Sequence, residues 1–353
     1  MLVAALAKDS QPLVAFEAFL LASADYPRHR PSVFSVNALL AALVRADRID
    51  FAEKAFRVAL RRRVSPDLFT FNIVISGLCK IGQLRKAGDV AKDIRVWGLA
   101  PSVVTYNTLI NGHLNVLDGF CTRGMMVEAE DWIDGMAQRE VKPNVVTYNT
   151  LVNGYSRLGK MEEAVAVKEA MAGKGISPNV KTYNCLLAGF ISSCDWRSVS
   201  GLLDEMKEKG VRGDVITYNE LINGLCCKGE VWKAVKLLDE MFEVGLEPRH
   251  LTYNTIIQGF CEKGDIKAAY EIRSRMNKSK KRANVVTYNL FLKYFCKMGK
   301  MEEANELLNE MLEKCIVPSG VTYEIINAGM VEKGFVPDIR GYATDNSKSL
   351  TSS

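Results

Sequence analysis

Hydrophobic positions along the chain fall into two helical patterns that alternate at a fixed interval. In residues 145–179, a first apolar stripe at helical spacing ends at Gly159, and a second stripe runs from Met161 to Met171. Pro178 then prevents the second helix from continuing. Each segment of this kind predicts a helix, a short turn, a second helix and another short turn.

The same pattern returns every 35 residues, apart from one step of 42. The phrase Val-Val-Thr-Tyr-Asn stands at 103–107, 145–149 and 285–289, and close variants begin at 33, 68, 180, 215, 250 and 320. A period of this size is typical of stacked helical pairs, in which each repeat packs mainly against its neighbours. We therefore predict an all-α solenoid of helix-turn-helix repeats.

The expected boundaries follow from this period. Residues 1–32 read as a degenerate amino-terminal half-repeat or cap, 320–342 as a truncated carboxy-terminal repeat or cap, and 343–353 as a disordered tail. Residues 11–32 resemble the second half of a repeat whose first half is missing, which suggests a truncated chain, and no transit peptide is visible. The eight repeats are 33–67, 68–102, 103–144, 145–179, 180–214, 215–249, 250–284 and 285–319.

The third repeat carries seven surplus residues, His-Leu-Asn-Val-Leu-Asp-Gly at 113–119. Seven residues are about two helical turns, so the first helix could lengthen and keep its face. A bulged loop and an artefact of the gene model are the other two interpretations, and the sequence does not choose among them.

Composition adds little to this picture. The chain has 353 residues, of which 48% are hydrophobic and 25% charged, and its net charge is +5. No apolar run is long enough to span a membrane. A charge this small favours no particular partner by itself, so attraction to an anionic polymer must come from where the charges lie.

Columns of small and apolar residues predict the packing between helices. The cysteines never approach CxxC spacing and only three histidines are present, so we expect core residues and no metal site. The columns are Ala52, Ala87, Ala129, Ala164, Ala234, Ala269 and Ala304; Met136, Met171, Met206, Met241, Met276 and Met311; and Cys79, Cys121, Cys226, Cys261 and Cys296.

The fifth residue of each repeat is asparagine in all eight repeats. Asparagine is a poor helix former, so helix propensity does not explain this column. Its amide carries donors and an acceptor in one plane, which suits the edge of a nucleobase. The structural alternative is a ladder in which each amide bonds to the next repeat. The column is Asn37, Asn72, Asn107, Asn149, Asn184, Asn219, Asn254 and Asn289.

The last residue of each repeat varies among a few polar types. Asp, Ser and Asn are preferred helix caps, and this residue precedes the next helix, so capping explains seven of the eight. A last residue that varies, while the fifth residue does not, is instead typical of a position that determines specificity. The capping and the specificity interpretations both stay open. The column is Asp67, Ser102, Asn144, Asn179, Asp214, Arg249, Asn284 and Ser319.

A basic residue follows the first helix in seven of the eight repeats. A line of such charges can follow a phosphate backbone. Lys and Arg are also favoured near helix carboxyl ends, so an ordinary solvated turn is the alternative. The residues are Arg45, Lys80, Arg123, Arg157, Lys228, Lys263 and Lys297.

Together these residues resemble a known family. Segments such as VVTYNTLVNGYSRLGKMEEAVAVKEAMAGKGISPN and VITYNELINGLCCKGEVWKAVKLLDEMFEVGLEPR are similar to pentatricopeptide repeats of the pure P-type class of plant organelles, over roughly 33–342. The resemblance implies a right-handed superhelix that binds single-stranded RNA, one base per repeat. It also implies a mitochondrial location, or alternatively the chloroplast, a role in RNA processing, stability, splicing or translation, and other organellar RNA-processing proteins as further partners.

The resemblance also implies a role for each column. The fifth and last residues read the base edge, and the second residues of adjacent repeats sandwich the base. Uracil presents an N3–H donor and cytosine an N3 acceptor, so an Asp should favour uracil while Ser or Asn can donate to cytosine. The expected target is 5′-UCYYU?YC-3′, in which the sixth base is unassigned because Asn219 with Arg249 matches no family pairing. The seven surplus residues of the third repeat leave room for a gap after the third base. The sandwiching residues are Phe34, Phe69, Val104, Val146, Ile216, Leu251 and Val286, and Lys181 departs from this apolar column.

We expect no enzyme activity, no catalytic residues, no cofactor and no membrane partner. The deaminase tails that some family members carry need an H-x-E and a C-x-x-C, and neither is present. No residues remain for an acidic nuclease domain. The last unit has Glu324 in place of the asparagine, so it reads as a cap. The competing function is an α-solenoid scaffold for protein–protein interaction, in which the polar columns are purely structural.

Overall fold

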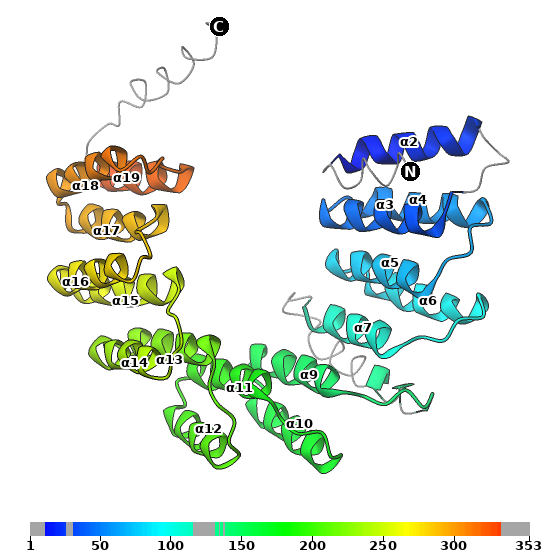
Figure 1. Cartoon of the computed structure of the whole chain (residues 1–353), viewed down its shortest axis with the longest axis horizontal. Coiled ribbons are helices and arrows are strands. Elements are labelled where there is room, and N and C mark those ends of the chain that lie inside the picture. The colour runs from blue at the N-terminus through cyan, green and yellow to red at the C-terminus, as the bar shows by residue number, and fades with distance from the viewer. Residues whose placement is uncertain (1–10, 26–30, 116–130, 134, 137, 333–353) are drawn as a thin grey trace, which may run out of the picture. The chain divides into compact units, whose positions relative to one another are not determined.

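The computed structural model describes residues 11–25, 31–115, 131–133, 135, 136 and 138–332. Within them every regular element is an α-helix (Figure 1), so the predicted all-α repeat architecture is confirmed. The chain divides into two compact units, Met1–Ser193 and Cys194–Ser353. Among these described residues, no helix combines the length and the apolar character that crossing a bilayer requires.

The first unit is a series of helical pairs preceded by α2. The first helix of a repeat contacts its own second helix and the first helices of both neighbours; α5, for example, contacts α6, α3 and α7. The helices are α2 (Pro12–Asp25), α3 (Val33–Arg45), α4 (Ile49–Arg61), α5 (Leu68–Lys80), α6 (Leu84–Val96), α7 (Val103–Asn115), α9 (Val145–Arg157), α10 (Met161–Gly173) and α11 (Val180–Ser192).

The second unit has the same arrangement. Here α15 contacts α16, α13 and α17. The helices are α12 (Trp196–Glu208), α13 (Val215–Cys227), α14 (Val231–Glu243), α15 (His250–Lys263), α16 (Ile266–Lys278), α17 (Val285–Met298), α18 (Met301–Glu313) and α19 (Gly320–Glu332). The side-by-side first helices therefore place the same repeat position of successive repeats along one face.

Helices end where the backbone enters the left-handed region. Gly159 after α9 has φ +71 and Gly175 after α10 has φ +74, a conformation that glycine adopts without a Cβ clash. The predicted glycine stop is therefore confirmed. Arg63 and Cys315 take the same conformation with φ 56, so the turn geometry persists where the glycine is replaced.

The columns of small and apolar residues form the core, as predicted. The described alanines are at most 4% exposed, the methionines at most 3%, and Cys79, Cys226, Cys261 and Cys296 at most 8%. Burial raises the pKa of Cys79, Cys226 and Cys261 to about 12, so these thiols stay protonated at neutral pH. Ala129 and Cys121 lie outside the described residues.

Three of the four described buried cysteines, Cys79, Cys226 and Cys296, face a glycine of the next repeat, which the sequence reading did not identify. A Cβ added to Gly112 would lie 2.4 Å from Cys79 Sγ, and one added to Gly329 would lie 2.5 Å from Cys296 Cβ. Neither position has room for a side chain. The first helices of adjacent repeats thus approach closely because a small soft residue meets a glycine.

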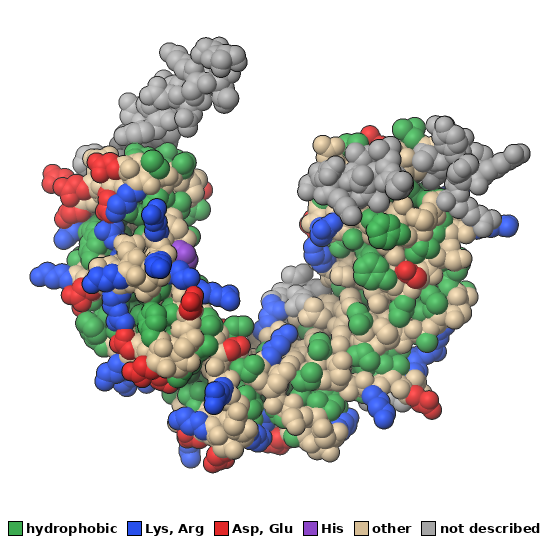
Figure 2. All heavy atoms as spheres, in the orientation of Figure 1, with side chains coloured by type: hydrophobic (Ala, Val, Ile, Leu, Met, Phe, Trp, Pro, Cys, Tyr) green, Lys and Arg blue, Asp and Glu red, His purple; other side chains and the backbone are tan. Residues whose placement is uncertain are grey.

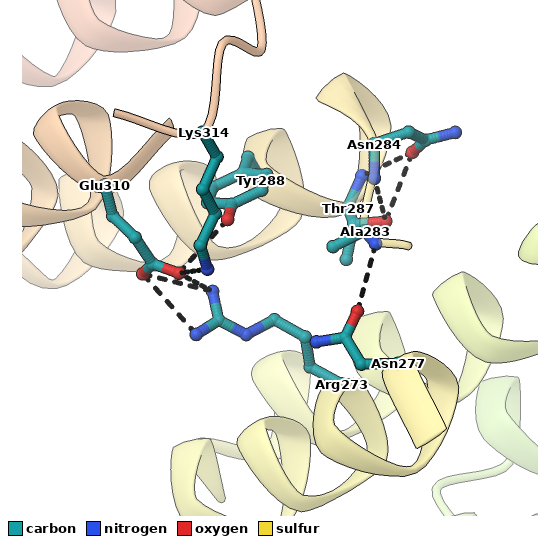
Figure 3. Close-up of polar contacts among 8 residues, drawn as sticks. All are labelled: Arg273, Asn277, Ala283, Asn284, Thr287, Tyr288, Glu310 and Lys314. Atoms are coloured by element: carbon teal, nitrogen blue, oxygen red, sulfur yellow. Dashed lines mark hydrogen bonds and ion pairs between the residues drawn. The ribbon is translucent and has the colours of Figure 1, made fainter. Parts of the chain in front are cut away.

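A polar cluster joins the seventh and eighth repeats (Figure 3). The Arg273 guanidinium on α16 lies over the rings of Tyr288 and Phe291 and pairs with Glu310 of α18 at 3.2 Å. Glu310 also accepts a hydrogen bond from the Tyr288 hydroxyl at 3.1 Å. Burial tends to raise the pKa of Glu310, but the Lys314 hydrogen bond and the Arg273 charge hold it below its ordinary value. The cluster fixes α16 against α18.

The surplus segment of the third repeat is described only in part. Helix α7 continues through Asn115 and has 13 residues, as α5 has. His113 is 4% exposed and its Nδ1 lies 2.8 Å from the Leu109 carbonyl oxygen. Residues 116–119 lie outside the described residues, so the three interpretations of the insert stay open.

We predict that Gly112→Ala destabilises the protein by about 1–3 kcal/mol, because the new methyl group overlaps Cys79 Sγ. The matched control is Gly201→Ala in α12, where nothing lies within 4 Å of the added Cβ. That change should stabilise by about 0.5–1 kcal/mol, because alanine has the higher helix propensity. Urea unfolding followed by circular dichroism measures both, and equal effects would contradict the close approach.

Candidate nucleic-acid interface

Apolar side chains stand exposed at the second position of the repeats, in the first turn of each first helix. Phe34 is 68% exposed, Leu251 64% and Val146 47%, and the column also contains Phe69, Val104, Ile216 and Val286 at 55–61%. Lys181 is exposed as well. Apolar residues in the neighbouring positions of the same helices are buried or partly buried, so regular exposure at one position marks a surface suited to a ligand.

The asparagine side chains make contacts between repeats through their oxygens. Asn149 is 3% exposed, and its Oδ1 accepts a hydrogen bond from the Thr182 hydroxyl of the next repeat at 2.6 Å. The same bond has lengths of 2.7–2.8 Å in the five other described pairs, Thr70–Asn37, Thr105–Asn72, Thr252–Asn219, Thr287–Asn254 and Thr322–Asn289. The ladder alternative is therefore present, with threonine as the partner.

This ladder uses part of the asparagine amide, for which the sequence suggested both a donor and an acceptor role toward a base. The amide oxygen accepts from the threonine of the next repeat and keeps a further lone pair, and the NH₂ group carries two donors. In Asn37 that group donates to both carboxylate oxygens of Asp67, at 3.1 and 3.3 Å. In Asn149 it donates to Asn179 Oδ1 at 3.2 Å. The structure thus brings the fifth and last columns together in these two pairs.

A threonine at the third position organises these contacts, and sequence reasoning missed it. Six of the threonine hydroxyls donate to the asparagine of the preceding repeat and accept from the backbone N–H of their own cap residue; Thr252, for example, donates to Asn219 and accepts from Arg249 at 3.1 Å. The available signal was the phrase itself, since this position is Thr in every unit from residue 68 onward. The threonines are Thr70, Thr105, Thr147, Thr182, Thr217, Thr252, Thr287 and Thr322, and each is at most 3% exposed.

Five of the last residues act as helix caps, so the structural interpretation of this column is realised at those positions. Asp67 Oδ1 accepts from the Thr70 backbone N–H at 2.7 Å, and Asn284 Oδ1 accepts from Thr287 at 3.1 Å (Figure 3). Asn144, Asn179 and Asp214 cap in the same way. Arg249 has no acceptor atom in its side chain and caps nothing. Capping leaves the question of base reading open, because a carboxylate or amide has further hydrogen-bonding capacity.

Hydrogen bonds hold Asp67 in its ionised form. Burial alone would raise the pKa of Asp67, but the hydrogen bonds from Thr70 and Asn37 outweigh it and lower the pKa below its ordinary value. An ionised carboxylate is an acceptor only.

The ladder is interrupted at the third repeat. Asn107 Oδ1 is buried without a hydrogen-bond partner among the described residues, and the Thr147 hydroxyl donates to Asn144 Oδ1 instead, at 3.3 Å. The interruption falls in the repeat that carries the surplus segment 113–119. The third repeat, after which the sequence leaves room for a gap in base reading, therefore also lacks the threonine–asparagine hydrogen bond that the repeats on either side of it have.

The basic column is exposed, but several members have local partners. Lys80 Nζ donates to the Val44 carbonyl oxygen near the end of α3 at 3.3 Å, as expected for a cation at a helix carboxyl end. Lys228 pairs with Glu230 at 2.9 Å. Arg45, Arg157, Lys263 and Lys297 are also exposed, and Arg123 lies outside the described residues. A role in following phosphates stays a prediction.

In the part of the chain that the structure describes, no three His, Cys, Asp or Glu side chains gather as metal ligands.

We predict that Thr252→Val destabilises the protein by about 1–3 kcal/mol, because Asn219 Oδ1 loses its donor while valine keeps the threonine shape. Thr255→Val in the same helix is the control, since its hydroxyl donates only to the Leu251 carbonyl oxygen within α15. The control should stay within about 0.5 kcal/mol of the wild type. Chemical denaturation distinguishes the two, and a harmless Thr252→Val would contradict the ladder.

Acidification should remove the stabilisation that comes from Asp67. Folding lowers the pKa of Asp67, so its ionised carboxylate stabilises the folded state fully at pH values above the ordinary pKa of Asp. This stabilisation is lost as the pH falls through the pKa that Asp67 has in the folded protein. Asp67→Asn keeps a capping side chain but cannot ionise. The difference in Tm between wild type and Asp67→Asn should therefore be present at pH 7 and shrink at acid pH; a difference that grows on acidification would contradict the assignment.

Profiles of known families match the repeats. The profile of the PPR repeat family matches residues 31–80, 66–115, 115–157, 143–192, 178–227, 213–261 and 283–332. A pentatricopeptide repeat domain profile matches residues 251–298.

Individual relatives and a solved structure are similar over parts of their length. One pentatricopeptide repeat-containing protein of Arabidopsis thaliana is 47% identical over 55 residues, which is 15% of this chain and 7% of that protein. A chloroplastic one is 32% identical over 77 residues, 22% of this chain and 15% of that protein. The crystal structure of PPR10 from maize, in complex with an 18-nucleotide psaJ RNA element, is 24% identical with a TM-score of 0.53, covering 95% of this chain and 48% of PPR10. The likeness to PPR10 shows the fold. Because the family profiles match successive segments from residue 31 to residue 332, the chain belongs to the pentatricopeptide repeat family.

Proposed function

We propose that this chain binds single-stranded RNA in a sequence-specific manner, with one nucleotide per repeat. The observation that carries the proposal is the joint placement of two features at the start of each first helix. An exposed apolar side chain offers a surface on which a base can stack, and an asparagine amide held by the next repeat offers hydrogen bonds to the base edge. PPR10, whose fold this chain shares, has been crystallised with an RNA element.

The contacts of the asparagine refine how a base would be read. With its oxygen bonded to threonine, the amide is a donor and suits an acceptor such as a pyrimidine carbonyl. The last residue then selects between bases. Asp67, held in its ionised form, accepts from the uracil N3–H, whereas Ser102 can donate to the cytosine N3. The target 5′-UCYYU?YC-3′ is our proposal on this basis.

The sandwich and phosphate assignments complete the proposed binding mode. A base between two repeats would contact their two second residues, as between Phe34 and Phe69, which are 68% and 61% exposed. The exposed basic residues would follow the phosphates, so binding should weaken as salt increases.

The biological role proposed is occupancy of a transcript, which affects its processing, stability, splicing or translation without a catalytic step. One relative is named as a chloroplastic protein, which supports an organellar location for this chain. We propose the mitochondrion or the chloroplast. The proposal for the whole protein also includes organellar RNA-processing proteins as partners.

A scaffold for protein partners is the second candidate. It is favoured by the finding that both polar columns already have structural tasks, the asparagines in the ladder and the last residues as caps. Exposed aromatic residues outside the second column, such as Trp97, Trp232 and Phe242 at 41–57%, offer contacts to a protein.

We predict that the protein prefers uracil at the first base by on the order of tenfold over cytosine, and that Asp67→Ser reverses this preference. Fluorescence anisotropy with two RNAs that differ only at that base measures the effect, at low and moderate salt. Asp93→Ser is the control, because it removes the same charge from an exposed residue of α6 outside the two columns.

Equal affinity for pyrimidine-rich and purine-rich RNA of the same length, with no change of preference in Asp67→Ser, would favour the scaffold.

A further inference from the structure

Arg249 is the last residue of the sixth repeat, and it breaks the rule that the other seven follow. Those residues are Asp, Ser or Asn, all with acceptor atoms. In the same unit, Asp214 Oδ1 caps α13 by accepting from the Thr217 N–H at 3.0 Å, and Asn284 Oδ1 caps α17. Helix α15 begins without a side-chain cap, because a guanidinium has five donors and no acceptor. Arginine here gives up a cap that most other repeats have, which is the kind of local conflict expected at a functional position.

The backbone around Arg249 nevertheless keeps the geometry of the other repeats. Its N–H donates to the Thr252 hydroxyl at 3.1 Å, and that hydroxyl donates to Asn219 Oδ1 at 2.7 Å. The Arg249 side chain therefore leaves the chain from the same place as the caps do. The side chain at this position therefore differs from those of the other repeats, whereas the hydrogen bonds of Thr252 to its neighbours are the same.

Both edge-reading groups of this repeat are donors. The Asn219 oxygen is directed to the Thr252 hydroxyl, from which it accepts, so we take its NH₂ as the group offered to a base, and Arg249 offers N–H groups alone. Arg249 is exposed and forms no ion pair with any of the described residues. Glu220, which follows Asn219 on α13, is half-buried, and burial raises the pKa of its carboxyl.

The surroundings of Arg249 are basic. His250 Nε2 lies 3.1 Å from the Arg282 carbonyl oxygen, which ties the start of α15 to the loop before α17. That loop carries Lys280, Lys281 and Arg282. Figure 2 shows Lys and Arg side chains gathered over the part of this unit that Figure 1 labels α15 and α16. Glu247, two residues before Arg249, pairs with Lys281 at 3.7 Å, whereas Arg249 itself forms no ion pair with the described residues, so a negatively charged strand would be attracted to it.

Stacking surfaces for a base are present on both sides of this position. Ile216, the second residue of the sixth repeat, is 56% exposed, and Leu251, the second residue of the seventh, is 64% exposed. The sixth repeat therefore has the apolar second residue that most repeats share, and it differs from them in its last residue.

A base that fits two sets of donors must present adjacent acceptors. Uracil places its N3–H donor between its two carbonyl acceptors. Cytosine presents N3 and O2 as adjacent acceptors, but its N4 amino donor lies beside N3, where a further N–H of the guanidinium would face it. Adenine places its N6 amino group beside N7. Guanine alone presents O6 and N7 side by side, and these match the fork of a guanidinium in a bidentate contact. We propose that the sixth repeat selects guanine through Arg249, assisted by Asn219; this inference rests on the RNA-binding function proposed above.

The test uses four RNAs with the core 5′-UCUUUNUC-3′, flanked by adenosines, in which N is G, A, C or U. A parallel series with one extra uridine after the third base covers the register that the surplus segment of the third repeat could impose. We expect the wild-type chain to bind the G form about tenfold more tightly than the other three, in one of the two series. Anisotropy at fixed salt measures the four dissociation constants.

Three variants separate base reading from charge and from folding. Arg249→Lys keeps the charge but loses the fork, so the preference for G should fall while the salt dependence of binding persists. Arg249→Asp should switch the preference at this base to uracil and raise the Tm, because it restores a cap on α15. Asn284→Asp, in the next repeat, is the matched control: it should alter the preference at the seventh base and leave that for G at the sixth unchanged.

Each outcome decides a different point. Wild-type binding that is selective at the first and fifth bases but indifferent at the sixth would overturn the guanine assignment and leave the RNA-binding proposal standing. Indifference at the sixth base combined with a shallower salt dependence in Arg249→Asp would assign Arg249 to a phosphate instead. Absence of any base preference in the wild type would overturn the proposed function itself. A guanine preference that survives in Arg249→Lys would also contradict the bidentate contact.

Discussion

The hydroxyl of the threonine at the third position is the interaction on which the rest of this structure depends. It donates to the asparagine oxygen of the preceding repeat and accepts from the backbone N–H of its own cap residue, as Thr287 does from Asn284 while donating to Asn254. One buried group thus joins the first helices of two repeats and fixes where the second of them begins. Because a buried acceptor left without its donor costs about 1–3 kcal/mol, this position tolerates few alternatives.

The ladder also decides what the fifth and last columns can present to a ligand. Asparagine is held with its oxygen toward the next repeat, so its NH₂ lies beside the cap residue, in direct contact for Asn37 with Asp67 and for Asn149 with Asn179. A structural and a recognising role are therefore compatible in one residue, since each uses a different atom of the side chain. Arg249 is informative for the same reason. It keeps the backbone contact of a cap residue and abandons the side-chain contact, which leaves its guanidinium available.

Most of the fold could be predicted from the sequence because every structural position is sampled several times in one chain. The buried alanines, methionines and cysteines and the glycine stops were each identified from their columns. The pairing of Cys79 with Gly112 was not, although both residues stand in visible columns. Periodicity places a residue on a face of its helix, but which residues of two helices meet depends on their separation and angle. The threonine was missed because it was read as part of a recurring phrase.

By itself, the sequence determined the period, the helical pairs, the core columns and the identity of the residues that recur on one face. These follow from local properties, namely side-chain spacing, helix propensity and the turns that glycine and proline impose. Only the tertiary structure decided that the asparagine oxygen is already bonded to the threonine of the next repeat and that the second residues stand exposed. Those outcomes depend on contacts between residues about one repeat apart, and no pattern within a single repeat specifies how the polar atoms of two repeats pair.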